Sequence, residues 1–483
     1  MKDISNLGQL KKSGYVSKTI KQELRDNLIL KIQNKEKSFE GIMGFDSTVI
    51  PDLERAILSR HNILLLGLRG QAKTKIARLL INLLDEYIPI IEGSELNDDP
   101  LSPISKYAKD LVKEKNDETP ITWIHRSDRY VEKLATPDVT IADLIGDVDP
   151  IKAATLKLPY SDERVIHFGL IPRSHRSIFV INELPDLQAR IQVSLFNILQ
   201  EGDIQIRGFK IRLPLDIEFV FTANPEDYTN RGSIITPLKD RIESQILTHY
   251  PDSLETAMEI TKQEAKIHPD QETHIKVAPI HRLLIEMISF NARKSEYVDD
   301  KSGVSARLSI SALENLYSSI ERRMIYNKEK SAKSRITDFL GIIPAITGKI
   351  ELVYEGEQEG PFNVAMNLIF KSCTELFLKY YPNPNQKLIK DFKDDYGAIK
   401  LWFSAGNEIE LFNNNTDGNF IKLLEEIPGL KKVSEKFRSE NELVEMMELA
   451  LFGLSGCDVL SKNILDGSMY FSDPLSDMFN ELN

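Results

Sequence analysis

The segment Gly67-Leu-Arg-Gly-Gln-Ala-Lys-Thr74 places glycines, a lysine and a hydroxyl side chain directly after the apolar run Ile63–Leu66. Glycines permit a turn whose backbone N–H groups surround an anion, and a following helix adds its positive end. A lysine there reaches the β- and γ-phosphates of a nucleoside triphosphate, and the threonine hydroxyl binds Mg²⁺. The alternative is a chance strand, loop and helix, since Ala72 stands where such loops usually have glycine. The predicted ATP contacts are Gly67, Gly70, Gln71, Ala72, Lys73, Thr74 and Lys75.

A second apolar run, Ser177–Ile181, ends in the polar pair Asn182-Glu183. Glu183 is a candidate general base that polarises the attacking water. Asn182 is a candidate Mg²⁺ ligand, although it lacks the charge of the aspartate that is usual at this place. This departure predicts weaker Mg²⁺ binding, slower hydrolysis, or ATP binding without turnover. The plain alternative is that the pair only ends a strand and caps a helix.

Three further polar residues follow in an order that suits ATP hydrolysis. Asn224 comes after the apolar run Phe219–Phe221, where an amide can hold the water in line with the γ-phosphate. Arg241 can place its guanidinium on the phosphates of a neighbouring subunit, and Arg307 can report the γ-phosphate from a separate helical lid. The alternatives are an Asn-Pro turn, a surface ion pair and a solvated arginine at a helix start.

Short apolar runs alternate with helical patterns from Phe39 to about Tyr250, which predicts an α/β domain with a parallel sheet. The runs interpreted as its strands are Ile63–Leu66, Ile121–Ile124, Ile178–Ile181 and Phe219–Phe221. Apolar residues from Ile204 to Leu213 nearly alternate about Arg207-Gly208, which predicts a β-hairpin. The chain reads as helical from about Ser253.

Four segments follow from these patterns. They are an N-terminal helical segment (1–38), the α/β core (39–250), a helical lid (251–340) and a C-terminal extension of unknown role (341–483). In the extension, the residues from Ile399 to Phe412 are interpreted as a possible hairpin.

Composition excludes several classes of protein. The chain has 483 residues and a net charge of −12, which argues against a dedicated nucleic-acid binder. Its two cysteines, Cys373 and Cys457, lie far apart, so neither a disulfide framework nor a zinc module is expected. No secretory signal and no membrane span is apparent, so a cytoplasmic location is predicted.

With these five elements in this order, the chain resembles the MoxR and magnesium-chelatase I-subunit group of AAA+ ATPases. FEGIMGFDSTVIPDLERAIL resembles the opening segment of that group, and ATPDVTIADLIGDVDPIKA resembles its insert in the second helix. VIHFGLIPRSHRSIFVINEL resembles its approach to the acidic strand end, and the hairpin matches the one before the sensor strand. The resemblance runs from about Phe39 to Arg322.

The resemblance implies an AAA+ P-loop core with helices on both faces of the sheet, a helical lid and a mainly helical C-terminal extension. It implies a hexameric ring motor that hydrolyses ATP and remodels a client. The partner would carry a von Willebrand factor A (VWA) domain, and the work would often insert a metal or mature an enzyme. By resemblance, the roles are phosphate and Mg²⁺ binding (Lys73, Thr74), Walker B (Asn182, Glu183), sensor 1 (Asn224), the finger in trans (Arg241) and sensor 2 (Arg307).

Three alternatives stay open at this point. A genuine magnesium chelatase subunit is disfavoured by the long C-terminal extension. A nucleic-acid motor is suggested by three hairpin cations, Arg207, Lys210 and Arg212, and opposed by the acidic balance. A scaffold that binds ATP without hydrolysing it is suggested by Asn182.

Overall fold

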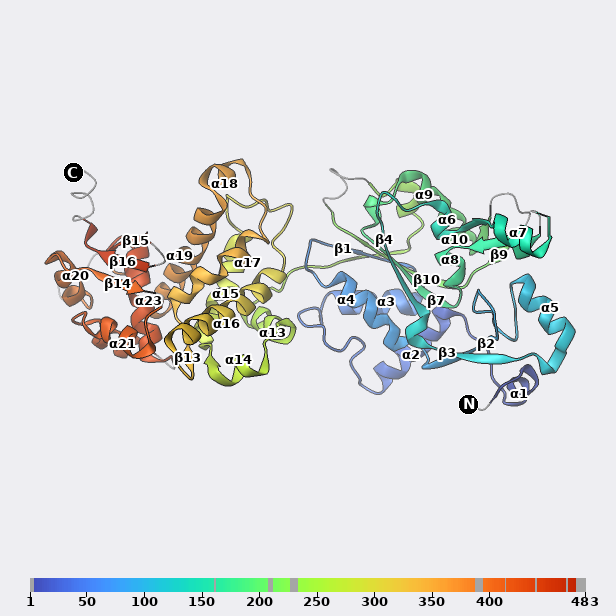
Figure 1. Cartoon of the computed structure of the whole chain (residues 1–483), viewed down its shortest axis with the longest axis horizontal. Helices are drawn as coiled ribbons and strands as arrows, with labels where there is room; N and C mark the ends of the chain where they lie inside the picture. The colour runs from blue at the N-terminus through green and yellow to red at the C-terminus, as the bar shows by residue number, and fades with distance from the viewer. Residues whose placement is uncertain are drawn as a thin grey trace. The chain divides into compact units, whose positions relative to one another are not determined.

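The computed structural model divides the chain into two compact units, Met1–His249 and Tyr250–Asn483 (Figure 1). It describes residues 4–159, 162–206, 212–225, 233–386, 394–412, 414–438, 441–465 and 468–474. The finer division expected from the sequence, into four segments, stays a prediction.

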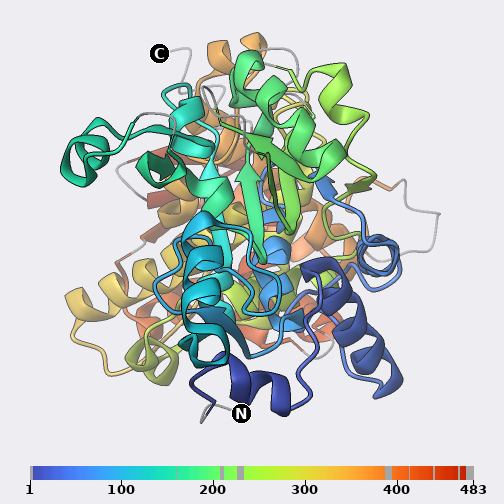
Figure 2. The ribbon, with the colours of Figure 1, turned by 90° about the vertical axis from the view of Figure 1, so that its right-hand side faces the viewer.

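The first unit is built on a five-stranded sheet of order β11-β1-β10-β7-β4, in which every pairing is parallel (Figures 1 and 2). All residues of β1, β7 and β10 are buried, as strands covered on both faces should be. This confirms the predicted α/β fold. The strands are β1 (Ile63–Leu66), β4 (Tyr130–Leu134), β7 (Ser177–Asn182), β10 (Ile217–Ala223) and β11 (Ser244–Leu247).

Alternate residues of β1 enter two separate hydrophobic cores, so both faces of the sheet are covered. Ile63 and Leu65 pack with apolar residues of α2, α3 and α4, whereas Leu64 and Leu66 pack with those of α6, α8, α9 and α10. The helices of this unit are α1 (Leu7–Lys12), α2 (Ile20–Gln33), α3 (Val49–Ser59), α4 (Lys73–Leu79), α5 (Lys106–Lys115), α6 (Ile141–Leu144), α7 (Pro150–Leu156), α8 (Leu170–Arg173), α9 (Ala189–Ser194), α10 (Phe196–Glu201) and α12 (Thr236–Lys239).

One predicted strand is wrong in its place. Ile121–His125 forms β3, which pairs antiparallel with β2 (Tyr87–Ile91) in a separate two-stranded sheet. The outer strand of the central sheet is instead β4, whose residues are only half-buried. An edge strand needs an apolar side chain on one face only, so its sequence does not form an apolar run.

The predicted hairpin before β10 is confirmed. β8 (Asp203–Gln205) and β9 (Arg212–Pro214) pair antiparallel, with Ile204 opposite Leu213. Arg207 and Lys210 lie outside the described residues. Arg212 is exposed and forms an ion pair with Asp203 at 3.6 Å. In addition, β5 (Gly146–Val148) and β6 (Ile166–Phe168) pair antiparallel in a small separate sheet.

Helix α2 is anchored to the unit by a buried ion pair. The Arg129 guanidinium donates two hydrogen bonds of 2.7 Å to the Glu23 carboxylate, and both side chains are under 5% exposed. Glu23 also accepts the backbone N–H of Asp85 at 2.7 Å, and Arg129 donates to the Arg176 carbonyl at 2.9 Å. The pair therefore joins the N-terminal helix to three segments beneath it.

Replacing Glu23 with alanine is expected to lower the free energy of unfolding of the first unit by about 3–5 kcal/mol, because it leaves a buried guanidinium without its carboxylate. Urea unfolding followed by Trp123 fluorescence, in a Trp402→Phe background, measures this unit alone. Asp117→Ala is the matched control, since it removes only an exposed ion pair with Lys11. Equal stability of the two variants would contradict an anchoring role for the pair.

The second unit is mainly helical, and one hydrophobic core runs through it from Ile275 to Phe471. Its helices are α13 (Leu254–Glu264), α14 (Pro269–His274), α15 (Pro279–Ala292), α16 (Arg307–Asn327), α17 (Ile343–Thr347), α18 (Tyr354–Glu359), α19 (Pro361–Tyr380), α20 (Gly397–Ser404), α21 (Asp417–Glu425), α22 (Leu430–Phe437) and α23 (Leu443–Gly456). Its strands are β12 (Ile275–Lys276), β13 (Ala332–Lys333), β14 (Ile409–Phe412), β15 (Ser461–Leu465) and β16 (Ser468–Ser472).

A buried charge network links α16 to the C-terminal part of this unit. Arg323 contacts Asp338 at 3.1 Å and Asp417 at 2.8 Å, and the Arg323 and Asp338 side chains are almost fully buried. Burial raises the pKa of Asp338, and the charge of Arg323 opposes that rise. The paired charges satisfy one another where water is excluded.

The hairpin expected between Ile399 and Phe412 is wrong. Helix α20 occupies its first half, and β14 pairs antiparallel with the distant β16 instead of with a neighbouring strand. Helix α20 buries Ile399 and Phe403, which are four positions apart, and this is the spacing of one helix face.

Among the described residues, no helix combines the length and apolar character that a membrane crossing needs.

Candidate nucleotide site

The parallel register brings the predicted site residues to one edge of the sheet. Leu66 pairs with Ala223, and Phe221 pairs with Ile181. The residues that follow these strand ends, Gly67, Asn224 and Glu183, therefore emerge side by side. Open α/β sheets bind ligands at the carboxyl ends of their strands.

The predicted phosphate loop, Gly67–Thr74, is closely packed where it leaves β1. A Cβ added to Gly67 would overlap the Thr248 hydroxyl and the Gln71 side-chain oxygen, so any larger residue would have to displace these two side chains. The Thr248 hydroxyl donates to the buried Gln71 side-chain oxygen at 2.8 Å. Because Thr248 directly follows β11, this hydrogen bond holds the loop against the end of that strand. Gln71 is thus a structural support of the loop in this structure.

Two loop residues have left-handed backbone, Gly70 with φ 73° and Ala72 with φ 57°. The conformation is free for glycine but costs an alanine roughly 1–2 kcal/mol. Residues in such conformations persist where the surrounding structure imposes them, often at ligand sites. Ala72 thus keeps the backbone turn that glycine usually makes in this loop.

Lys73 contacts the loop itself, whereas Lys75 contacts a different segment. The Lys73 side chain is buried and its ammonium donates to the carbonyls of Gly67 and, at 3.0 Å, Leu68. Lys75 donates to the Gly41 carbonyl at 2.9 Å, which ties α4 to the segment before α3. Lys73 therefore lies across the loop that would receive phosphate, whereas Lys75 is directed to the opening segment.

Asn182 and Glu183 are joined through Thr222 of β10. The Thr222 hydroxyl donates to the Asn182 side-chain oxygen at 3.1 Å and accepts the backbone N–H of Glu183 at 3.1 Å. Glu183 has left-handed backbone with φ 54°. This non-glycine strain at the strand end is a mark of a functional position.

Glu132 of β4 also reaches this edge. It accepts the Asn182 amide N–H at 2.6 Å and two hydrogen bonds from Arg78 at 2.9 and 3.2 Å. Burial alone would raise the pKa of Glu132, but the hydrogen bonds and charge of Arg78 outweigh it and lower the pKa. Burial and the neighbouring Glu132 raise the pKa of the Tyr130 phenol, which donates to the same carboxylate at 3.2 Å.

Asn224 is 3% exposed, and its side-chain oxygen has no hydrogen-bond partner among the described residues. Leaving a buried amide oxygen unpaired costs about 1–3 kcal/mol, so such a group needs a reason. A bound water or phosphate oxygen at the sheet edge would supply one. The role of Asn224 in positioning water stays a prediction.

The two arginines predicted to act at the γ-phosphate lie away from this edge or in the other unit. Arg241 follows α12, donates to Gln200 at 2.9 and 3.1 Å and to the Pro237 carbonyl at 2.7 Å, and stacks over Phe196 at 4.7 Å. Arg307 is exposed at the first position of α16 in the second unit. Their roles stay predictions.

The residues present fit a nucleotide-bound Mg²⁺. Thr74 offers a hydroxyl, Asn182 an amide oxygen and Glu183 a carboxylate, and hard oxygen donors of this kind suit Mg²⁺. Within the described ranges, no group of three or more His, Cys, Asp or Glu residues could hold a metal alone. Mg²⁺ in nucleotide sites is usually held by one or two side chains together with phosphates and waters.

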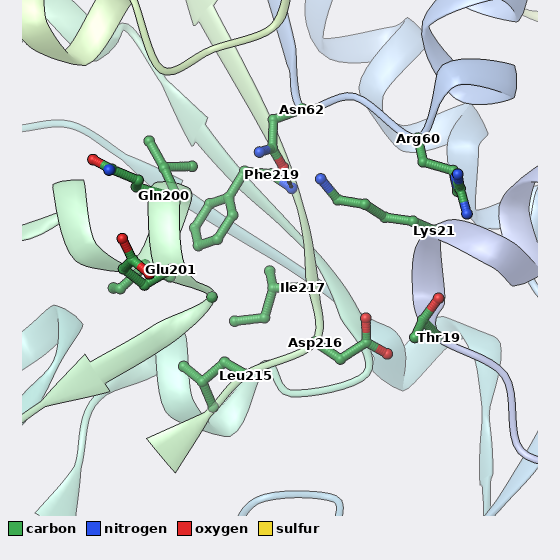
Figure 3. Close-up of a pocket in the computed structure, with 13 residues that line it drawn as sticks. Thr19, Lys21, Arg60, Asn62, Gln200, Glu201, Leu215, Asp216, Ile217 and Phe219 are labelled. Carbon is green, nitrogen blue, oxygen red and sulfur yellow. Dashed lines mark hydrogen bonds between the residues drawn. The ribbon is translucent and has the colours of Figure 1, made fainter. Parts of the chain in front are cut away.

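A separate hollow of about 440 Å³ lies at the opposite, amino-terminal ends of β1 and β10 (Figure 3). Lys21 and Arg60 line one side, and Glu201 and Asp216 line the others. Burial raises the pKa of Asp216 to about 6, although its carboxylate accepts the backbone N–H of Ile20. Because the hollow lies at the amino-terminal ends of these strands, it is distinct from the phosphate loop, which follows the carboxyl end of β1.

The strand order, the loop after the inner strand β1, the polar end of β7 and the hairpin before β10 now stand together. The first unit has the parallel α/β fold expected from the sequence, with the segment Gly67–Thr74 running from β1 into α4. Helices cover both faces of its sheet, and the mainly helical second unit follows it.

No protein-family model matches the chain. Among solved structures, the chain is similar to a candidate ATPase from Cytophaga hutchinsonii (17% identity, TM-score 0.30), covering 75% of this chain and 97% of that one. It is similar to BchI in a complex of the magnesium chelatase subunits BchI and BchD (19% identity, TM-score 0.35), covering 66% and 98%. It is also similar to a RuvB variant from Thermotoga maritima (12% identity, TM-score 0.36), covering 64% and 73%.

These identities and TM-scores are low, so the fold of the first unit is defined by its own strand order and loop.

Three residues of the site were missed by sequence reasoning: Arg78, Glu132 and Thr222. Thr222 carries a signal, since a hydroxyl interrupts the apolar strand before Asn224. Arg78 and Glu132 lie in ordinary charged positions of a helix and an edge strand, and only the folded chain brings them to Asn182.

Proposed function

We propose that the chain is an ATP-hydrolysing AAA+ ring motor, similar to the MoxR and magnesium-chelatase I-subunit group, that remodels a partner protein. The observation that carries this proposal is the register that collects the phosphate loop, Asn182-Glu183 and the orphaned Asn224 oxygen at one sheet edge. ATP is the ligand whose phosphates, metal and attacking water match those three features in that order.

Each residue then has a task in hydrolysis. Lys73 would leave its loop carbonyls for the β- and γ-phosphates, where its positive charge stabilises the transferred group. Glu183 would take the proton of the attacking water, and Asn224 would hold that water in line. When bound through Thr74 and Asn182, Mg²⁺ would neutralise charge on the phosphate oxygens.

A ring would complete the site from outside the chain. Arg241 is partly exposed and held by Gln200, so it has to leave that contact to reach a neighbour's phosphate. Arg307 would report the γ-phosphate from the lid. A hexamer, a VWA-domain partner, metal insertion and a cytoplasmic location are the finer parts of the proposal and follow from the family resemblance.

Replacing Arg241 with alanine is expected to lower ATP turnover by on the order of 10³-fold while leaving ATP binding intact, because a finger in trans acts on transition-state charge. Steady-state phosphate release measures turnover, and titration with a fluorescent ATP analogue measures binding. Lys239→Ala is the matched control, since Lys239 is an exposed cation at the end of α12, two residues before Arg241.

A mixing experiment tests whether Arg241 acts across subunits. Equal parts of the Arg241→Ala and Lys73→Ala chains, each inactive alone, should regain activity, because some interfaces then join an intact loop to an intact finger. A mixture as inactive as its components would contradict the role in trans, provided that size-exclusion chromatography shows mixed assemblies.

One observation favours a second function, an ATP-gated scaffold without turnover. Asn182 lacks the charge that normally helps to hold Mg²⁺ in a hydrolysing site. This candidate predicts tight nucleotide binding with no phosphate release at any Mg²⁺ concentration, and Glu183→Gln would then leave its function unchanged.

A further inference from the structure

The Asn182 amide is held at both of its ends. Its nitrogen donates to Glu132 at 2.6 Å, and its oxygen accepts the Thr222 hydroxyl at 3.1 Å. A carboxylate can only accept, so the amide nitrogen must face Glu132. The Asn182 oxygen is thereby turned away from β4, and an amide oxygen keeps a second lone pair beyond the one that Thr222 uses.

The register of β4 and β7 makes this contact possible. Leu134 pairs with Asn182 and Glu132 pairs with Val180, so the Glu132 and Asn182 side chains project from the same face of the sheet. Arg78 then fixes the carboxylate with two hydrogen bonds from α4. Arg78 lies one helical turn after Thr74, on the same side of that helix. The contacts thus run from the phosphate-loop helix to both strands of the site.

We propose that Glu132 is a positioning residue for Asn182, and that the carboxylate charge missing from the end of β7 has been kept on β4. This inference rests on the proposed function. Glu132 holds the amide in the one orientation that offers oxygen to a nucleotide-bound Mg²⁺ or its water. Residues that hydrogen-bond to a metal ligand without touching the metal tune metal affinity in many sites.

Restoring the usual aspartate at position 182 would change the contact with Glu132. Asn182→Asp would replace the amide N–H that Glu132 accepts with a second carboxylate, so two negative charges would repel at hydrogen-bond distance while Arg78 still donates to Glu132. The substitution alone should therefore damage the site. Combining it with Glu132→Gln should restore one carboxylate and one amide, with the same hydrogen bond in reversed sense.

A four-protein cycle of wild type, Glu132→Gln, Asn182→Asp and the double variant tests the proposal. Two quantities are measured: the thermal unfolding midpoint without nucleotide, and the MgCl₂ concentration that half-saturates binding of a fluorescent ADP analogue. Glu132→Gln should raise the half-saturating MgCl₂ concentration by about tenfold. Asn182→Asp should lower the midpoint by roughly 2–4 °C, and the double variant should recover both quantities. Glu95→Gln, which only breaks an exposed pair with Lys152, is the control.

Additive effects in the unfolding cycle would overturn the pairing of the two residues. An unchanged MgCl₂ requirement in Glu132→Gln would overturn the positioning role even if the protein were less stable, because a merely structural carboxylate would alter only the midpoint. A wild-type chain that binds no nucleotide would overturn the proposed function and the positioning role together. The unfolding cycle would still decide in that case whether the pair exists, so the two failures are distinguishable.

Discussion

Replacing Lys73 with alanine is expected to weaken ATP binding by the pure protein at least about 100-fold. The substitution removes the only ammonium that the structure, within its described residues, places on the carbonyls of Gly67 and Leu68 at the base of the phosphate loop. Hydrogen bonds to charged groups contribute about 1.5–3 kcal/mol each, so losing those to two phosphates accounts for this factor. Isothermal titration calorimetry with ATP and Mg²⁺ measures the loss.

Lys75→Ala is the matched control for this prediction. Lys75 is the next lysine along the chain, two residues after Lys73, and its ammonium donates to the Gly41 carbonyl in the structure. Its removal should weaken binding much less, by loosening α4 against the opening segment. Equal losses in the two variants would contradict the placement of Lys73 on the phosphates and would indicate that both lysines act only by holding the loop in shape.

Replacing Glu183 with glutamine should leave ATP binding near the wild-type value while lowering turnover by about 10²–10⁴-fold. A neutral amide cannot accept the proton of the attacking water, and positioned general bases contribute rate factors of this size. The change is nearly isosteric, so the left-handed backbone at this position should persist. Single-turnover phosphate release, measured beside analogue binding, separates the chemical step from affinity.

Glu201→Gln controls for loss of a carboxylate elsewhere in the same unit, since Glu201 is exposed at the end of α10. Its turnover should match the wild type. If Glu183→Gln turned over ATP at the wild-type rate, Glu183 would not be the general base. The proton would then have to leave through another group at this sheet edge.

The parts of the site that sequence reasoning predicted are those with local signals. Strands β1, β7 and β10 are short, mainly apolar runs that lead directly to the predicted site residues, and the structure buries every residue of these strands. Burial on both faces is why these strands are mainly apolar and therefore visible in a sequence. Glu183 and Asn224 were found because they stand directly after such runs.

The parts that were missed depend on contacts between distant segments. β4 contains Glu132 and Lys133, so it does not read as a buried strand, whereas Ile121–His125 does and yet belongs to a small antiparallel sheet. An apolar run indicates a strand but not its neighbours. The Glu132–Asn182 hydrogen bond joins residues on β4 and β7, two strands that lie far apart in the sequence and pair only in the folded chain.

The prediction for the C-terminal part of the chain was wrong for a related reason. The residues Ile399–Phe412 contain a helix face and then a strand, and both repeats are too short to separate by periodicity alone. The partner of β14 is β16, near the end of the chain. Nothing local to β14 specifies that pairing, because its register is set by burial of Leu411 against a distant core.

Steady-state ATP turnover of the pure protein, measured across a range of Mg²⁺ concentrations, tests the central claim most directly. Our account predicts saturable phosphate release that depends on Mg²⁺, requires Lys73 and Glu183, and needs a higher Mg²⁺ concentration in Glu132→Gln. ATP binding without phosphate release at every Mg²⁺ and protein concentration would contradict a motor that works alone and would favour the ATP-gated scaffold.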